Sequence, residues 1–170
     1  MESNEAPFTC LAAGQEADLV AAVQMGDRAA FLELVRHYQR PLYRLAYAMN
    51  RNGAEAEALA QSAFAHAWKS ISDYPSGRRF YPWLLRILQS LLTKDPPARA
   101  NQEQAGALEM ALDSLRPEDR MPLALRIVER VRYAEIAALL DVPTGLVTLR
   151  IAQARGAILA RAGGPEGRSQ

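Results

Sequence analysis

With 170 residues, 49% hydrophobic and 23% charged, the chain can hold one medium domain or two small ones, and this composition excludes disorder throughout. The net charge of +1 is unevenly spread, with +4 over residues 17–94, +3 over residues 116–161 and −6 elsewhere; this suits two modules that touch a polyanion, although a solvated surface explains it almost as well. The single cysteine, Cys10, excludes a disulfide framework and a thiolate metal site, and His37 and His66 have no cluster of other ligands nearby, so we expect neither metal nor cofactor.

Residues 1–15 are predicted to be a disordered tail. They contain two acidic and no basic residues, and so lack the positive start and apolar core of a secretory signal. No apolar run along the chain approaches the ~18 to 20 residues that span a bilayer. We therefore expect a cytoplasmic protein without membrane insertion.

The first module is predicted over residues 16–94 and opens with two helices. A short one covers residues 16–25 and ends at Gly26, and Asp27 then caps a longer one. Pro41 interrupts the longer helix and is expected to kink it. An apolar stripe at helical spacing marks its buried face: Phe31, Leu34, Val35, Tyr38, Leu42, Leu45 and Met49.

Two further helices complete this module. A turn over residues 50–53 precedes a third helix from residue 55 to about 70, turn-forming residues make 72–79 a loop, and a fourth helix covers 80–93. The inward positions are Leu59, Ala63, Phe64, Ala67 and Trp68 in the third helix, and Trp83, Leu84, Ile87 and Leu91 in the fourth.

A domain boundary is predicted after the fourth helix. Residues 95–102 form a linker, because two consecutive prolines forbid helix there. The second module, residues 103–162, begins with helices near 103–114 and from 117 to about 130. The tail 163–170 is predicted to be disordered.

Residues 133–155 predict a short helix, a tight turn and a second helix, the layout of a helix-turn-helix DNA-binding motif. Pro143 cannot continue the first helix, and Thr144 stands where its oxygen can cap the second. Val147, Ile151, Ala154 and Ile158 form one buried stripe. The outward positions, predicted to meet DNA, are Thr144, Thr148, Leu149, Arg150, Gln153 and Arg155. Alone this pattern is weak, since any two packed helices with a short polar joint look similar.

Several motifs in order give an all-α chain of two small helical domains that resembles a bacterial RNA polymerase sigma factor of the sigma-70 family, extracytoplasmic-function (ECF) group. The resemblance covers residues 17–161. It is carried by Glu55-Ala-Glu-Ala-Leu-Ala-Gln-Ser-Ala-Phe-Ala-His-Ala-Trp68, Phe80-Tyr-Pro-Trp-Leu-Leu-Arg-Ile87, Leu115-Arg-Pro-Glu-Asp-Arg120 and Tyr133-Ala-Glu-Ile-Ala137, with Val142-Pro143, Gly145, Val147, Arg150 and Ala154-Arg155 in the final helix pair.

The resemblance implies that the chain recruits RNA polymerase core to promoter DNA and has no catalysis of its own. The first module would dock on the polymerase through Glu57, Leu59, Gln61 and Phe64. It would open the −10 element with Lys69, Tyr74, Arg78, Arg79, Phe80, Tyr81 and Trp83, whose cations suit phosphates and whose aromatic rings suit unstacked bases. The outward face of the helix-turn-helix would read the −35 element. Phe80 and Trp83 could instead be core residues, and Arg78 and Arg79 could merely solubilise a loop.

The sequence departs from the family pattern mainly at contact positions. Ala58 and Ser62 stand where the family usually has acids, and Leu146, Thr148 and Leu149 alter the reading helix. These departures leave open an alternative, a degenerate sigma-like protein that binds an anti-sigma factor or another partner without initiating transcription. An enzyme is disfavoured, because no nucleophile with a base, no paired carboxylates and no glycine-rich phosphate loop are found.

Overall fold

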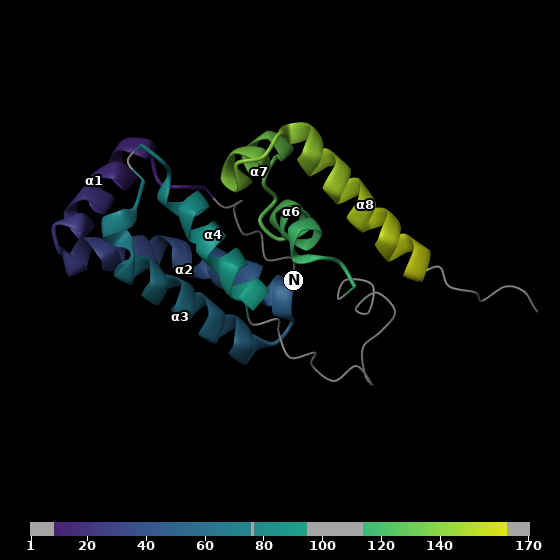
Figure 1. Cartoon of the computed structure of the whole chain (residues 1–170), viewed down its shortest axis with the longest axis horizontal. Helices are drawn as coiled ribbons and strands as arrows, with labels where there is room; N and C mark the ends of the chain where they lie inside the picture. Colours follow the sequence, from purple (N-terminus) through teal and green to yellow (C-terminus); the bar gives the residue numbers. More distant parts are fainter. Residues whose placement is uncertain (1–8, 76, 95–113, 163–170) are drawn as a thin grey trace, which may run out of the picture.

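The computed structural model describes residues 9–75, 77–94 and 114–162, and every regular element in these ranges is helical (Figure 1). The elements are α1 (Ala13–Gln24), α2 (Arg28–Asn50), α3 (Gly53–Lys69), the 3-10 turn η1 (Ile71–Asp73), α4 (Phe80–Lys94), α6 (Pro117–Ile127), α7 (Tyr133–Leu140) and α8 (Thr144–Ala162). The all-α prediction is confirmed. The predicted linker, the tail 163–170 and nearly all of the helix near 103–114 lie outside the described residues. Within those residues, no helix has the length and apolar character needed to cross a bilayer.

The first module comprises α1 to α4, with α2 at its centre. Asp27 caps α2 as predicted, because its carboxylate accepts hydrogen bonds from the backbone N–H groups of Ala29, at 2.8 Å, and Ala30, at 3.2 Å. The helix continues through Pro41 to Asn50, so the proline does not end it. The predicted apolar stripe forms the core: Leu34, Tyr38, Leu42 and Leu45 are fully buried.

The structured part of the chain begins earlier than the sequence predicted. Helix α1 starts at Ala13, and Cys10 and Leu11 already lie against the core. The reason is Tyr38, whose hydroxyl accepts a hydrogen bond from the Leu11 N–H at 3.2 Å and so gives this backbone a partner inside the protein. Burial raises the pKa of the Cys10 thiol to about 11, so this cysteine is a protonated thiol at neutral pH.

The second module comprises α6, α7 and α8. Met121 and Leu125 of α6, Ile136 of α7, and Val147 and Ile151 of α8 make its core, each exposing at most 1% of its surface. The chain turns from α7 into α8 at Asp141, which adopts the left-handed conformation with a φ of 55°. Asp and Asn tolerate this conformation better than most side chains do. The two helices are thereby set as a helix-turn-helix pair.

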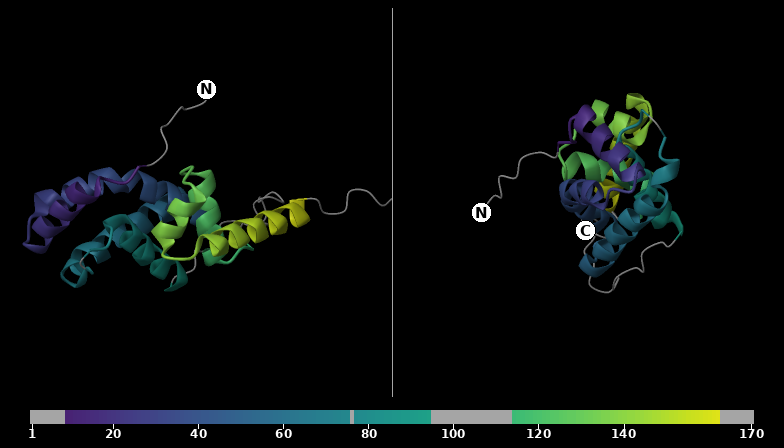
Figure 2. Two further views of the ribbon diagram at one scale, coloured as in Figure 1. Left: turned by 90° about the horizontal axis from the view of Figure 1, so that it is seen from above. Right: turned by 90° about the vertical axis from the view of Figure 1, so that its left-hand side faces the viewer.

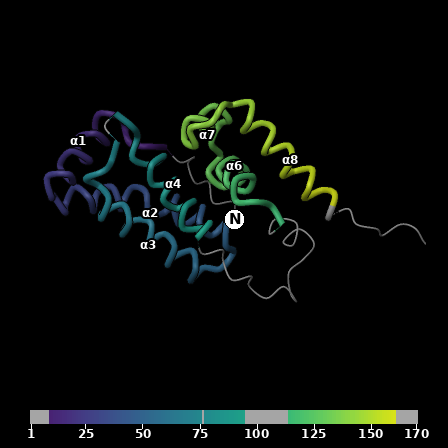
Figure 3. Tube along the Cα trace, in the orientation of Figure 1, coloured from purple at the N-terminus to yellow at the C-terminus, as the bar shows by residue number. Residues whose placement is uncertain are grey.

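The two modules contact each other, which could not be predicted from the sequence. Helix α2 meets α6, and α4 meets both α6 and α7, so that α4 lies on the side of the first module that faces the second (Figure 1, Figure 3). The other views show the same contact (Figure 2). Arg120 of α6 donates a hydrogen bond to the Met49 carbonyl of α2 at 2.6 Å. Arg44 of α2 donates one to the Val128 carbonyl at 2.7 Å.

Candidate nucleic-acid interface

The exposed face of α8 is the clearest candidate surface. Val147, Ile151 and Ala154 are buried against α6 and α7, which turns the intervening positions outward. Five of the six predicted DNA-contacting residues are exposed: Thr144, Thr148, Leu149, Gln153 and Arg155. Leu149 exposes 52% of its surface, which leaves an apolar contact available to a partner.

Two details of α8 differ from the prediction. Thr144 is the first residue of the helix and not the residue before it, and the Pro143 carbonyl accepts hydrogen bonds from the Leu146 and Val147 N–H groups in this first turn. Arg150 is half-buried, and one nitrogen of its guanidinium lies 3.4 Å from the Glu118 carbonyl of α6. Part of this cation therefore faces the second module's own backbone.

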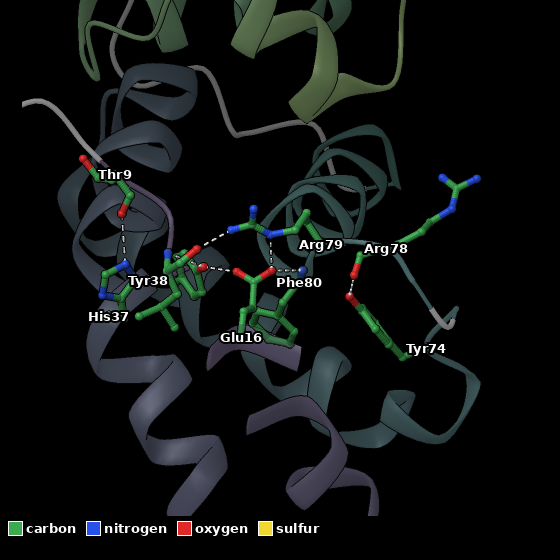
Figure 4. A network of polar contacts seen from close by, with 9 residues as sticks. Thr9, Glu16, His37, Tyr38, Tyr74, Arg78, Arg79 and Phe80 are labelled. Carbon is green, nitrogen blue, oxygen red and sulfur yellow. Dashed lines mark hydrogen bonds and ion pairs between the residues drawn. The ribbon is translucent and has the colours of Figure 1, made fainter. Parts of the chain in front are cut away.

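The start of α4 is fixed by a buried carboxylate that the sequence reasoning missed. The side chain of Glu16 is 2% exposed and accepts hydrogen bonds from Arg79 Nε at 2.8 Å, from the Phe80 N–H at 2.7 Å and from the Tyr38 hydroxyl (Figure 4). Arg79 also donates to the Leu11 carbonyl. Because Phe80 is the first residue of α4, this carboxylate pairs with one of the N–H groups that the helix itself leaves unpaired at its positive end.

This network changes how the predicted −10 residues are placed. Arg79 points toward Glu16, whereas Arg78 points away from it (Figure 4). Tyr81 is fully buried and stacks on Tyr38, with ring centroids 4.9 Å apart, so the expected contact of its ring with bases is wrong for this structure. The same correction applies to Tyr74, which is buried and donates its hydroxyl to the Arg78 carbonyl.

The other aromatic side chains at the start of α4 divide between core and surface. Phe80 is fully buried, which agrees with the alternative prediction that it is a core residue. Trp83 is half-buried and meets the Tyr74 ring edge-on at 5.2 Å. Burial raises the pKa of Tyr74 to about 12 and also raises the pKa of Tyr81 well above its ordinary value. Among the predicted aromatic residues, Trp83 alone keeps partial access to a base.

Between the end of α3 and the middle of α4, the exposed cations are Lys69, Arg78 and Arg86. Arg86, an exposed residue of α4, belongs to the motif quoted above but was assigned no role. The feature that could have pointed to it is that it is the one cation of this helix before the terminal Lys94. Arg78 and Arg86 both contact the carboxylate of Asp141 in the second module, at 3.1 and 2.5 Å. Asp141 was likewise missed, since no role was predicted for it from the sequence.

On α3, the residues predicted to bind polymerase are split. Glu57 and Gln61 are both exposed and are joined by a hydrogen bond from Gln61 Nε2 to Glu57 Oε1 at 3.2 Å. Leu59 is half-buried. Phe64 is 8% exposed and packs edge-on against Phe31, with centroids 6.4 Å apart, so its predicted role as a contact residue is corrected to a core residue.

Comparison with known proteins gives a consistent result. The family model described as Sigma-70 region 2 matches residues 34–94, and that described as Sigma-70, region 4 matches residues 105–158. The ECF RNA polymerase sigma-E factor of Escherichia coli is 32% identical over 82% of this chain and 90% of its own length.

Solved structures share the fold. That of CnrH in complex with the cytosolic domain of CnrY matches with a TM-score of 0.69 and 25% identity, covering 86% of this chain and 96% of that one. The sigma factor RpoE of Bartonella quintana, solved in complex with the anti-sigma factor NepR, matches with a TM-score of 0.57 and 18% identity over 80% of this chain and 98% of its own.

Proposed function

Because the chain belongs to the ECF group of sigma-70 factors, we propose that it directs RNA polymerase core to specific promoters and acts in the cytoplasm. One observation carries the proposal: both sigma regions occur in order in one chain, and the second ends in a helix whose outward face is free to meet DNA. No catalytic step is assigned to the protein itself.

In this proposal the second module reads the −35 element with α8. A helix of this kind lies in the major groove, where Gln153 can contact a base edge and Leu149 a thymine methyl group. Arg155 supplies a phosphate contact, which positions the helix without specifying sequence. The first module receives the −10 element through Lys69, Arg78 and Trp83, which retain exposed or partly exposed side chains.

The docking surface for the polymerase core is proposed on α3, around Glu57 and Gln61. Both side chains are exposed on one face of the helix, four residues apart. Replacing Glu57→Arg reverses a charge there, and we expect weaker capture of core polymerase. The matched control is Glu33→Arg, which makes the same change at an exposed position of α2.

Run-off transcription with purified core polymerase tests the proposal. The protein is added to core enzyme and a library of promoter fragments, and core enzyme alone is the control. We expect a small set of specific transcripts that require the protein. A library that yields no protein-dependent transcript counts against promoter recognition, provided that the core enzyme is active with another sigma factor.

The alternative function, binding of an anti-sigma factor without initiation, is favoured by one feature of α3. Ala58 and Ser62 are exposed and uncharged, so this face carries few carboxylates for the polymerase. Affinity capture from cell extract separates the two functions. Recovery of core polymerase subunits contradicts the alternative, whereas recovery of an anti-sigma factor without core subunits supports it.

A further inference from the structure

We infer that α8 selects A·T base pairs at the centre of the −35 element. The side of this helix that faces away from its own module presents apolar groups and one amide, and within residues 144–160 it carries no cation. Leu149 and Gln153 are the residues to which we assign this specificity. The inference deepens the proposed function and rests on it, because it names the base pairs that the DNA-reading helix accepts.

The buried side of α8 fixes which residues face outward. Three of its apolar residues expose at most 1% of their surface and pack against α6 and α7: Val147, Ile151 and Ala154. Since an α-helix turns by about 100° per residue, the opposite side carries Leu149, Ala152 and Gln153, and all three are exposed. Leu149 and Gln153 are four residues apart, so they are neighbours on the helix surface and can contact adjacent base pairs.

The cations of α8 lie at the two edges of this outward side. Arg150 is half-buried on one edge, where a guanidinium nitrogen lies 3.4 Å from the Glu118 carbonyl of α6. Arg155 is exposed on the other edge. Cations in these places suit the phosphates that border a groove. The commonest specific contact to guanine is a bidentate one from arginine or lysine, and the outward side has no such donor within residues 144–160.

The groups on the outward side match an A·T pair. In the major groove this pair shows the thymine C5-methyl group, together with the N7 acceptor and the N6 donor of adenine. Leu149, which exposes 52% of its surface, can bury the methyl group, and the Gln153 amide can donate to N7 and accept from N6. Thr148 adds no free donor for guanine, because its hydroxyl already donates to the Thr144 carbonyl at 3.1 Å.

Selection from a promoter library tests the preference. The full-length protein is bound to purified core polymerase, and transcribed fragments are recovered from a library that is randomised at both promoter elements. We expect adjacent A·T pairs at the centre of the upstream element. Enrichment of G·C pairs there overturns the inference and leaves the proposed function standing. If no fragment is transcribed, the proposed function is rejected and the inference falls with it.

Removal of a methyl group tests the contact itself on a selected fragment. Uracil pairs with adenine as thymine does and lacks only the C5-methyl group. We expect the complex of protein and core polymerase to bind the fragment with uracil at the central position of the upstream element about fourfold more weakly, the effect of exposing one buried methyl group. Equal binding of the thymine and uracil fragments, measured by mobility shift, overturns the inference.

Two leucine variants identify the residue responsible. Leu149→Ala removes the apolar contact, so it should bind the thymine and uracil fragments equally. Leu159→Ala is the matched control, because Leu159 is also exposed on α8, at 71%, and lies about 15 Å further along the helix. Both leucines are exposed, so neither truncation opens a cavity. The control should keep the preference for thymine, and if Leu149→Ala keeps it as well, the assignment to Leu149 is wrong.

The role of Gln153 is tested on the adenine side of the pair. In 7-deazaadenine a C–H group replaces N7, so one of the two hydrogen bonds to Gln153 is lost. We expect the unsubstituted protein to bind the fragment with 7-deazaadenine more weakly than the fragment with adenine, and Gln153→Ala to bind the two fragments equally. A preference for adenine that persists in Gln153→Ala contradicts its assignment as a specificity residue.

Discussion

At the scale of single residues, the least expected feature is the buried carboxylate of Glu16. It accepts hydrogen bonds from Arg79, from the Phe80 backbone and from the Tyr38 hydroxyl, and so ties α1 to α2 and to the start of α4. A buried charge is tolerated only with such partners, because leaving water without them is strongly unfavourable. Glu16 therefore fixes the backbone on which Arg78 is presented.

Replacing Glu16→Gln tests this anchoring role. The amide keeps one acceptor but loses the charge that pairs with Arg79, and its NH2 group faces donors. We expect a loss of about 2 kcal/mol in the free energy of unfolding, less than for a fully buried pair because Arg79 is partly exposed to water. Urea denaturation measures it, with Asp18→Asn on the exposed side of α1 as the control.

If Glu16→Gln and Asp18→Asn unfold at the same urea concentration, the carboxylate has no anchoring role. A second readout distinguishes anchoring from general stability. Loss of the anchor should increase amide hydrogen exchange at Phe80 and its neighbours in the first turn of α4 more than in α8.

At the scale of elements, α8 is the case in which sequence periodicity predicted the surface well. Val147, Ile151 and Ala154, at spacings of four and three, are buried, and the polar positions between them are exposed except for the half-buried Arg150. One side of the helix packs on α6 and α7 and is apolar. The spacing of apolar residues in its sequence therefore identifies the buried side and the exposed side.

The role of Arg155 on that face gives a specific expectation. Arg155 is exposed, and Arg155→Ala should remove about one phosphate contact, which lowers the slope of log affinity against log salt by about one. Affinity for a promoter fragment bound by the polymerase complex should fall about equally for different −35 sequences. Gln153→Ala is the useful comparison, since loss of a base contact should instead reduce discrimination between sequences. An unchanged salt slope in Arg155→Ala would exclude the phosphate contact.

Helix α4 shows where sequence reasoning stops. Its position was predicted, but of the four residues predicted to face inward only Leu84 is buried, while Trp83, Ile87 and Leu91 are half-buried. Tyr81 was assigned to DNA and is fully buried, and Arg86 was given no role and reaches Asp141. Periodicity assigns faces to a helix, but a fourth helix that contacts α3 on one side and α6 and α7 on another has little free face left. Which aromatic ring stays exposed depends on those long-range contacts, and no local pattern encodes them. Phe64 differs, because periodicity placed it inward, and its burial beside Phe31 agrees with that pattern and not with the polymerase contact that the family resemblance implied.

At the scale of the whole molecule, the contact between the modules contains a second buried carboxylate. Glu129 follows α6 and is 3% exposed, with Arg44 of α2 at 3.2 Å. Burial raises the pKa of Glu129, and Arg44 and Arg40 oppose this only in part. At neutral pH, Arg44 and Arg40 therefore offset only part of the cost of burying this carboxylate.

The pH dependence of stability tests this property of Glu129. Because the folded protein holds a proton on Glu129 more tightly than the unfolded chain does, this group contributes most stability below its ordinary value of 4.5, and the contribution is lost as the pH rises through the raised folded pKa. Glu129→Gln has no such loss. Its melting temperature relative to the unsubstituted protein should therefore rise between about pH 4 and pH 7.

The control for this measurement has the opposite sign. Hydrogen bonds from Arg132 lower the pKa of Glu135, so its contribution is present above the ordinary value and is lost as the pH falls through the folded pKa. The melting temperature of Glu135→Gln relative to the unsubstituted protein should fall over the same pH range. Parallel trends for the two variants would mean that burial does not raise the pKa of Glu129, and the contact between the modules would then carry a fully compensated ion pair at neutral pH.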